Sequence, residues 1–286
     1  MMKNSPRRSS CPCIERGSII VISLWVLVFF SILGVTLFKM VSAQISLVKR
    51  LEGRVIGSDL ARSAVVYARQ ERESGSLGYD TLYSLKKERE KELGRDKFIY
   101  TLSDEESKIN INNSSGEILA RLPGLNNDLA QAVINSSLRP YTYKEELMQV
   151  EGFTEEIFNG CKDFITTHSN GKVNINTAPK EVLAALGLDA SLVENIEAFR
   201  HGPDDLEATE DDGFFESTAQ ILDKLRSFCG FSGQQEAELL ELSTSGNVCA
   251  AAENLCVNID AYVSGKSAMR YAVVFDKDKI KQWREW

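Results

Sequence analysis

The densest group of side chains that could do chemistry is a run of carboxylates between Gly202 and Gly213. Six of them fall within nine residues: Asp204, Asp205, Glu207, Glu210, Asp211 and Asp212. Carboxylate oxygens are the ligands that calcium prefers. The spacing is not that of an EF-hand loop, because the run has no Asp-x-Asp-x-Asp-Gly series. The run is therefore a candidate calcium site, and a solvated acidic loop is the alternative.

Groups that could act as catalysts are sparse. The two histidines, His168 and His201, lie far apart in the sequence, each outside any recognisable motif. The sequence has no metalloprotease helix, no nucleophile elbow and no glycine-rich phosphate loop. We therefore predict that the protein is not an enzyme and that both histidines are ordinary loop residues.

The six cysteines fall into two groups. Two lie near the N-terminus and four lie further on, at Cys11 and Cys13 and then at Cys161, Cys229, Cys249 and Cys256. The spacing of "CAAAENLC" is compatible with a small disulfide loop between Cys249 and Cys256 in an oxidising compartment. Four unpaired, small apolar residues are the alternative. The even number favours an exported body behind a short cytoplasmic leader.

The charge of the body argues against nucleic acid as a partner. The whole chain has a formal net charge of −8. Residues 1–17 hold four of the 33 basic and one of the 41 acidic residues, so the remainder carries −11. Affinity for a phosphate backbone comes from lysine and arginine displacing counterions. A body this acidic is a poor candidate for binding it.

An uncharged apolar segment follows the leader. Residues 18–38 are 21 residues without a formal charge, and at the helical rise they span about 30 Å, the thickness of a bilayer core. A cleavable signal peptide has an apolar core of only about 7–15 residues. "VSA" at 41–43 does resemble an ordinary cleavage site, but it follows Lys39. We predict a single-pass transmembrane helix over 18–38 that continues as an amphipathic helix over 39–75.

The middle of the chain contains an internal repeat. "KININ" (108–112) returns as "KVNIN" (172–176), 64 positions later, and the likeness continues through helical patterns and turns at Gly124 and Gly187. The pattern predicts a duplicated helical domain over 108–244. Asn176 and Thr177 are expected to cap the helix that begins near Pro179.

The repeated units resemble helix-hairpin-helix motifs, many of which bind DNA through turn amides and nearby lysines. Here the turn "LPGLNNDLAQ" carries Asn126, Asn127 and Asp128, and none of the related turns carries a lysine. We therefore predict that the hairpins serve packing, with DNA binding as the alternative.

Alternating, β-favouring stretches flank this domain. Residues 97–107, 254–265 and 268–278 read as strands, and a Gly-Lys-Ser turn joins the last two. An early strand, a long helical insertion and a terminal hairpin predict an α+β fold, with the sheet built from 95–107 and 245–286.

The N-terminal pattern resembles the type IV pilin and pseudopilin signature. A basic leader, residues 1–17, ends in Arg16-Gly17, and an apolar helix follows at once. The resemblance implies cleavage by a prepilin peptidase between Gly17 and Ser18. Most members carry a glutamate at mature position five, where this chain has Ile22. Lack of that glutamate is a feature of the general secretion pathway protein K family, the minor pseudopilin K of type II secretion.

The same family is indicated by motifs along most of the chain: "DEESKININ", "NGKVNINTAPKEVLAAL" and the tail "YAVVFDKDKIKQWREW". The resemblance implies a pilin-like long helix and antiparallel sheet with a large all-α, helix-hairpin-helix-like insertion. It also implies N-methylation, an inner-membrane anchor and a periplasmic body. Calcium binding has been associated with the family.

The implied role is at the tip of a type II secretion pseudopilus, where the subunit starts assembly. The implied partners are other minor pseudopilins of the I and J type, the prepilin peptidase and the inner-membrane assembly platform. Alternatives are a minor pilin of a type IV pilus, a membrane-tethered DNA receptor of the competence type, and an uncut anchor of another envelope complex.

Overall fold

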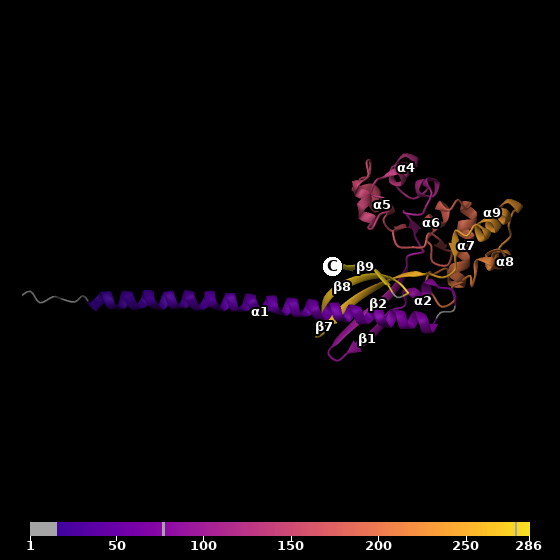
Figure 1. Cartoon of the computed structure of the whole chain (residues 1–286). Helices are drawn as coiled ribbons and strands as arrows, with labels where there is room; N and C mark the ends of the chain where they lie inside the picture. The colour runs from indigo at the N-terminus through magenta and orange to yellow at the C-terminus, as the bar shows by residue number, and fades with distance from the viewer. Residues whose placement is uncertain (1–15, 76–77, 278) are drawn as a thin grey trace, which may run out of the picture. The chain divides into compact units, whose positions relative to one another are not determined.

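The computed structural model describes residues 16–75, 78–277 and 279–286 (Figure 1). The leader residues 1–15, including Cys11 and Cys13, lie outside this range. The chain divides into two compact units, residues 1–55 and 56–286, which are described separately.

The first unit, where described, consists of the first part of α1 (Arg16–Gly75). The helix contains no proline, and its first part is rich in leucine, isoleucine and valine. From Ile19 to Val41 the large apolar side chains are exposed, with Trp25 at 70%. Isolated exposed leucines are normal, but a continuous apolar surface needs an apolar surrounding.

The second unit is built on one antiparallel sheet. Its strands are β1 (Arg89–Leu93), β2 (Asp96–Asp104), β7 (Asn254–Val263), β8 (Lys266–Asp276) and β9 (Lys279–Glu285), in the order β1-β2-β7-β8-β9. The predicted strands are confirmed. The structure adds β9, within the region assigned to the sheet, and β1, whose charged "REKEL" sequence lacks the alternation that the prediction relied on. Charged side chains of this kind protect an edge strand from pairing with another chain.

The last part of α1 covers one face of this sheet (Figure 1). Leu60, Ala61, Ala64, Val65 and Ala68 are buried there against alternate residues of the sheet, including Phe98, Tyr100, Val257 and Ile259. Three alanines at helical spacing let the helix backbone lie close to the strands. The amphipathic pattern of the sequence therefore has its partner within the chain from Leu60 onward.

The helical domain lies between β2 and β7 and has two halves. The first half contains β3 (Ile109–Asn110), α3 (Gly116–Ala120), α4 (Asn127–Asn135), η1 (Lys144–Gln149), α5 (Glu155–Cys161) and β4 (Ile165–Thr166). The second half contains β5 (Val173–Asn174), α6 (Lys180–Ala185), α7 (Ala190–His201), η2 (Gly202–Asp204), η3 (Thr218–Gln220), α8 (Ile221–Phe228), α9 (Gly233–Thr244) and β6 (Val248–Cys249). A short helix, α2 (Leu82–Lys86), precedes β1.

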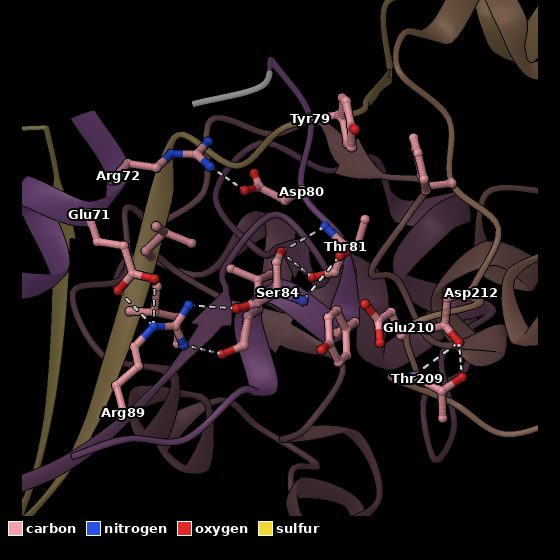
Figure 2. A pocket seen from close by; sticks show the side chains of 15 residues that line it. Glu71, Arg72, Tyr79, Asp80, Thr81, Ser84, Arg89, Thr209, Glu210 and Asp212 are labelled. Carbon is pink, nitrogen blue, oxygen red and sulfur yellow. Dashed lines mark hydrogen bonds and ion pairs between the residues drawn. The ribbon is translucent and has the colours of Figure 1, made fainter. Parts of the chain in front are cut away.

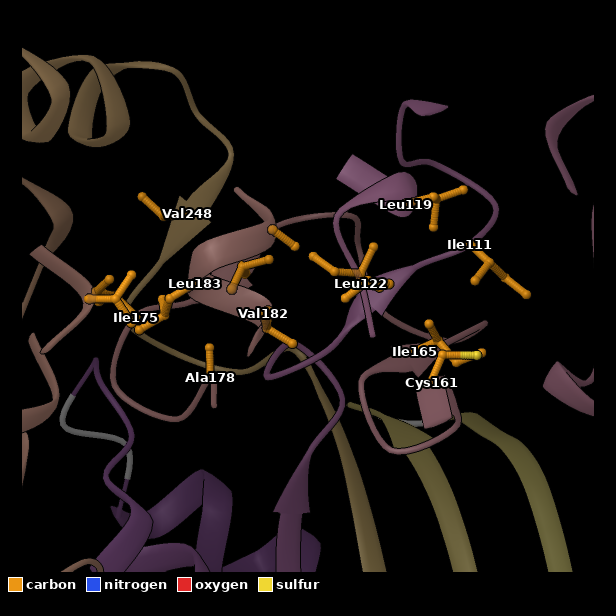
Figure 3. Close-up of a cluster of buried hydrophobic side chains, with 14 of the residues drawn as sticks. Ile111, Leu119, Leu122, Cys161, Ile165, Ile175, Ala178, Val182, Leu183 and Val248 are labelled. Atoms are coloured by element: carbon orange, nitrogen blue, oxygen red, sulfur yellow. The ribbon is translucent and has the colours of Figure 1, made fainter. Parts of the chain in front are cut away.

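Each half is closed by a short parallel ladder. β3 pairs with β4 at the start and end of the first half, and β5 pairs with β6 in the second. The two halves share one apolar core, and Figure 3 shows side chains of both in it, Leu122 and Val182 among them. Gly124 and Gly187 have φ of +80° and +95°, as turns between two helices require. The α+β prediction is confirmed.

One local prediction is wrong. Asn176 and Thr177 do not cap α6, whose N-cap is Pro179 without a side-chain hydrogen bond. Both side chains are instead buried and bonded elsewhere, Asn176 to Phe215 and Thr177 to Asp104. Local sequence identifies a residue that suits a cap, but tertiary partners compete for the same oxygen.

Candidate functional site

One helix is long and apolar enough to cross a membrane among the described residues. The stretch is 19–74, with a mean hydropathy of 2.7 in its most apolar window, and none of that window is buried inside the protein. Three hydroxyl groups of its apolar part bond to carbonyl oxygens of the preceding turn: Ser23 to Ile20 at 2.9 Å, Ser31 to Leu27 and Thr36 to Ile32 at 2.8 Å. These bonds satisfy the three hydroxyls within the helix, as an apolar surrounding requires.

The expected processing residues lie at the start of this helix. Gly17 and Ser18 are its second and third residues. Ile22 lies one turn further along, with its side chain 59% exposed. No carboxylate occurs in the uncharged run 18–38.

Two asparagines at equivalent positions of the repeat, Asn112 and Asn176, each bond a peptide group within their own half in the same way. The Oδ1 of Asn112 accepts from the amide of Tyr141 at 2.7 Å, and its Nδ2 donates to the carbonyl of Tyr141 at 2.9 Å. Asn176 makes both bonds to Phe215, each at 2.8 Å. Each asparagine therefore acts as a missing strand partner for one buried peptide. The sequence repeat is a repeat of hydrogen bonds.

Three consecutive acids at the end of β2 attach the sheet to the helical domain. Asp104, Glu105 and Glu106 are 3%, 6% and 0% exposed. Buried acids are rare and need partners. The partners of Asp104 are the amide of Glu106 at 2.7 Å, Asn174 Nδ2 at 2.7 Å and Thr177 Oγ1 at 2.6 Å. Those of Glu106 include Asn254, which donates from both its amide and its side chain.

Asp104 and Glu105 have opposite electrostatics. Burial and the nearby Glu106 carboxylate raise the pKa of Asp104 to about 8, against the hydrogen bonds from Thr177 and Asn174. Burial also raises the pKa of Glu105. The Lys108 ammonium, whose Nζ lies 2.7 Å from Oε1, and the hydroxyl of Thr166 outweigh it and hold this pKa below its usual value. Asp104 bonds to the second half and Glu105 to the first.

A similar ion pair fixes the segment after α1. The Asp80 side chain is 4% exposed, pairs with Arg72 and accepts from the amide of Ala252 at 2.6 Å. Arg72 in turn donates to the carbonyl of Ala252 at 2.7 Å. This pair joins the end of α1 to the chain entering β7.

The residues 104–166 match the family model of the helix-hairpin-helix motif. The match spans the end of β2 and the first half of the helical domain. A search of curated proteins gave no significant match. Among solved structures, a chain of the GspK–GspI–GspJ complex from the type 2 secretion system of enterotoxigenic Escherichia coli is similar, with 14% identity and a TM-score of 0.47. That likeness covers 82% of this chain and 98% of the other.

The turns of these hairpins present acidic or neutral side chains. α4 begins with Asn127 and Asp128, and α5 begins with Glu155 and Glu156. Carboxylates stabilise a helix N-terminus through its dipole, but they repel a phosphate at the same place. The geometry of the hairpin is present without the charge that DNA binding uses.

Three of the six carboxylates of the candidate calcium site, Asp204, Asp211 and Asp212, lie 3.5, 2.9 and 2.8 Å from the Thr209 hydroxyl, which donates to them; Asp205 and Glu207 have other partners. Asp205 faces His201, Glu207 pairs with Lys86 at 2.7 Å, and Asp212 accepts from the amides of Ala208 and Thr209. Asp204 accepts from the amide of Leu206, and Asp211 from the Thr209 hydroxyl. Within the described ranges, no three Cys, His, Asp or Glu side chains are placed to hold a metal. Calcium binding at this loop stays a prediction.

The cysteines of the body are free thiols: Cys161, Cys229, Cys249 and Cys256. The candidate bridge between Cys249 and Cys256 is not formed in this structure. Cys249 lies in β6, near Asp104 and Glu106, whereas Cys256 lies in β7, near Glu105 and Lys108. The two strands belong to different sheets. Burial raises the pKa of Cys256 to about 11, so its thiol is unreactive at neutral pH.

Of the two histidines predicted to be loop residues, His168 lies in a loop, whereas His201 is the last residue of helix α7 and the prediction is wrong for it. His168 is half-buried beside β9, and burial lowers its pKa. His201 ends α7, with Nδ1 3.6 Å from Asp205.

A pocket of 340 Å³ opens between the end of α1, α2 and the loop before η3. Figure 2 shows Glu71 and Arg89 on one side of it and Thr209, Glu210 and Asp212 on the other. Its walls are more apolar than polar. Sequence reasoning missed this pocket, because its walls come from segments more than 100 residues apart.

Proposed function

We propose that this protein is a minor pseudopilin that caps the tip of a type II secretion pseudopilus and starts its assembly with other minor pseudopilins. A single observation carries this proposal. An uncharged apolar helix begins at an Arg-Gly junction and continues, without a break, as the helix that packs on an antiparallel sheet. One element therefore provides both a membrane anchor and the spine of an exported domain.

The proposed cleavage site lies just after Arg16, the last charged residue before the uncharged segment. Cleavage between Gly17 and Ser18 by a prepilin peptidase on the cytoplasmic side removes Lys3, Arg7, Arg8 and Arg16. The mature chain then begins at the start of its apolar segment, with an N-methylated amine. Without the leader charges, the apolar helix alone holds the subunit in the bilayer. The subunit can then leave the bilayer and enter the fibre.

The proposed place at the tip follows from Ile22. Pilin subunits are thought to use a glutamate at this position to neutralise the terminal amine of the subunit above. A burying environment penalises an uncompensated charge. A subunit with Ile22 cannot offer this compensation and is best placed where no subunit lies above it. The helical domain, inserted between β2 and β7, also adds bulk that would hinder further addition.

The proposed location is the bacterial inner membrane, with a single pass and the body in the periplasm. The proposed partners are minor pseudopilins of the I and J type, the prepilin peptidase and the inner-membrane assembly platform. The structural neighbour in the GspK–GspI–GspJ complex is the reason to name these pseudopilin partners first.

The N-terminus of the membrane-extracted protein tests the proposal. Intact-mass and peptide analysis from cells with a prepilin peptidase should show a chain that begins at methylated Ser18. A Gly17→Val variant should keep the leader. Gly34→Ala is the matched control, since an added Cβ there meets no atom within 4 Å. A start at Gln44 would indicate ordinary secretion, and an intact leader on the wild type would indicate an uncut anchor; either result refutes the proposal.

The family match at 104–166 makes a DNA receptor the second candidate. Its test is binding of the full chain to duplex DNA at low salt, where a receptor should give a salt-dependent signal. The acidic hairpin starts predict none. A type IV pilus minor pilin is distinguished by deletion, which should abolish pili rather than enzyme secretion.

A further inference from the structure

We propose that the pocket between α1, α2 and the loop before η3 receives an arginine side chain of a partner protein. This inference rests on the residues of the pocket and does not depend on the proposed place in a pseudopilus. Figure 2 shows the labelled charged residues around its opening.

The floor of the pocket suits the aliphatic part of a long side chain. Leu85, Leu102 and Leu255 line it and are each no more than 5% exposed. Arginine buries its methylene groups along apolar surface while its charged end stays near polar groups. A small, fully charged ligand would gain nothing from these three leucines.

The walls suit a planar cation. Tyr79 stacks on Phe214 with ring centroids 4.6 Å apart and planes 8° from parallel. Tyr83 lines the same pocket and is 38% exposed. Aromatic faces attract cations, and a guanidinium can stack on them as well. The Lys224 ammonium already lies 4.9 Å from the centroid of the Phe214 ring, so Tyr79 and Tyr83 are the aromatic lining residues left for a new cation. Stacking on them favours arginine over the more strongly hydrated lysine.

The charges that line the pocket leave a negative surplus. Glu71 pairs with Arg89, and Asp80 pairs with Arg72, so these two carboxylates are compensated. Asp212 is held by the amides of Ala208 and Thr209. Glu210 is exposed and makes no hydrogen bond or ion pair with the described residues. It is the one lining carboxylate left to accept a partner, and arginine can bind a carboxylate with two parallel bonds.

Binding of short blocked peptides tests this assignment directly. The full-length protein in a nonionic detergent is titrated with acetyl-Gly-X-Gly-amide, where X is arginine, lysine, citrulline or norleucine, and ligand-observed NMR gives each Kd. Citrulline has nearly the shape of arginine without its charge. We expect the arginine peptide to bind and the citrulline peptide to bind at least about tenfold more weakly.

Variants place the binding in this pocket. Glu210→Gln should weaken the arginine peptide by about fivefold or more, and Tyr83→Leu should also weaken it. Glu117→Gln on α3 is the matched control, since Glu117 is also exposed and lies outside the pocket. Because both glutamates are exposed, neither change should alter the circular dichroism spectrum.

Each other outcome overturns the inference. Equal affinity for arginine and citrulline would exclude a charge-based site, and tighter binding of norleucine would identify a purely apolar socket. Equal affinity for lysine would remove the preference for arginine. No binding, or binding that Glu210→Gln leaves unchanged, would exclude this pocket.

Discussion

The two halves of the helical domain start from the same sequence pattern and end in different surroundings. In the first half, Asn112 is partly exposed and Asn113 is exposed. In the second half, the equivalent Asn176 and Thr177 are 3% and 5% exposed. The local turn is the same, since Asn110 and Asn174 each accept from the amide two residues on, at 2.9 and 3.1 Å. The difference is what packs over the turn.

The sheet explains this difference. Asp104 at the end of β2 bonds to Asn174 and Thr177, both in the second half. The first half reaches the same region through Thr166, which donates to Glu105, and through Glu145, which pairs with Arg284 of β9 at 2.7 Å. The second half is thus buried at its polar turn. The first half contacts the sheet through Thr166 and Glu145 instead, and its polar turn stays partly exposed. Duplication conserves local bonds, while the interface is specific to each copy.

The largest expected difference in unfolding free energy is between alanine variants of Asn176 and Asn112. Asn176→Ala leaves the buried peptide of Phe215 without partners and should cost about 3 kcal/mol of unfolding free energy. Asn112→Ala should cost only about 1 kcal/mol, because water can reach part of that site. Urea unfolding of the full chain in detergent, followed by circular dichroism, measures both. Equal losses would show that the surroundings of the two turns do not matter.

The stability contributions of Asp104 and Glu105, which attach the sheet to the second and first halves, should depend on pH in opposite directions. The pKa of Asp104 is raised, to about 8 from 3.8, so the folded state holds a proton that the unfolded state has released between these values. Stability from Asp104 is therefore lost as pH rises from about 4 to about 8. The pKa of Glu105 is lowered from 4.5, so its contribution is present above that value and is lost as pH falls through the folded pKa.

Two amide variants test these signs through the urea midpoint. Asp104→Asn should flatten the decline from weakly acidic to alkaline pH, and Glu105→Gln should flatten the loss on the acid side. Hydrogen exchange should place the first effect in the second half and the second effect in the first half. A wild-type midpoint that does not change between weakly acidic pH and about pH 8 would contradict the role given to Asp104.

The smallest expected contrast concerns helix capping. The Ser115 side chain accepts from the amide of Ile118 and caps α3, whereas Pro179 provides no side-chain bond to α6. Ser115→Ala should cost about 1 kcal/mol. Ser115→Thr keeps the hydroxyl and should restore most of the loss. If the threonine variant is as unstable as the alanine variant, the cap is not the cause.

Sequence patterns identified the elements more reliably than the contacts. The repeat, the strands at 97–107 and 254–278 and the long apolar helix all follow from periodicity. Burial of Asp104 and Glu106 could not be predicted, because acidic residues are almost always exposed. The repeat did carry a signal, since two asparagines at identical spacing in both halves suggest a shared bond. The pocket gave none, because Glu71, Tyr83 and Glu210 are brought together only by the fold.

The sequence by itself determined the apolar helix, the duplicated turn and the α+β order, since these depend on spacing along a few turns or strands. Only the tertiary structure decided that Thr177 binds Asp104 rather than capping α6, that the thiols of Cys249 and Cys256 are free, and that Glu210 lines an apolar pocket. The physical reason is the same in each case. A polar side chain can satisfy its hydrogen bonds in several ways, and the segments that pack around it select one of them.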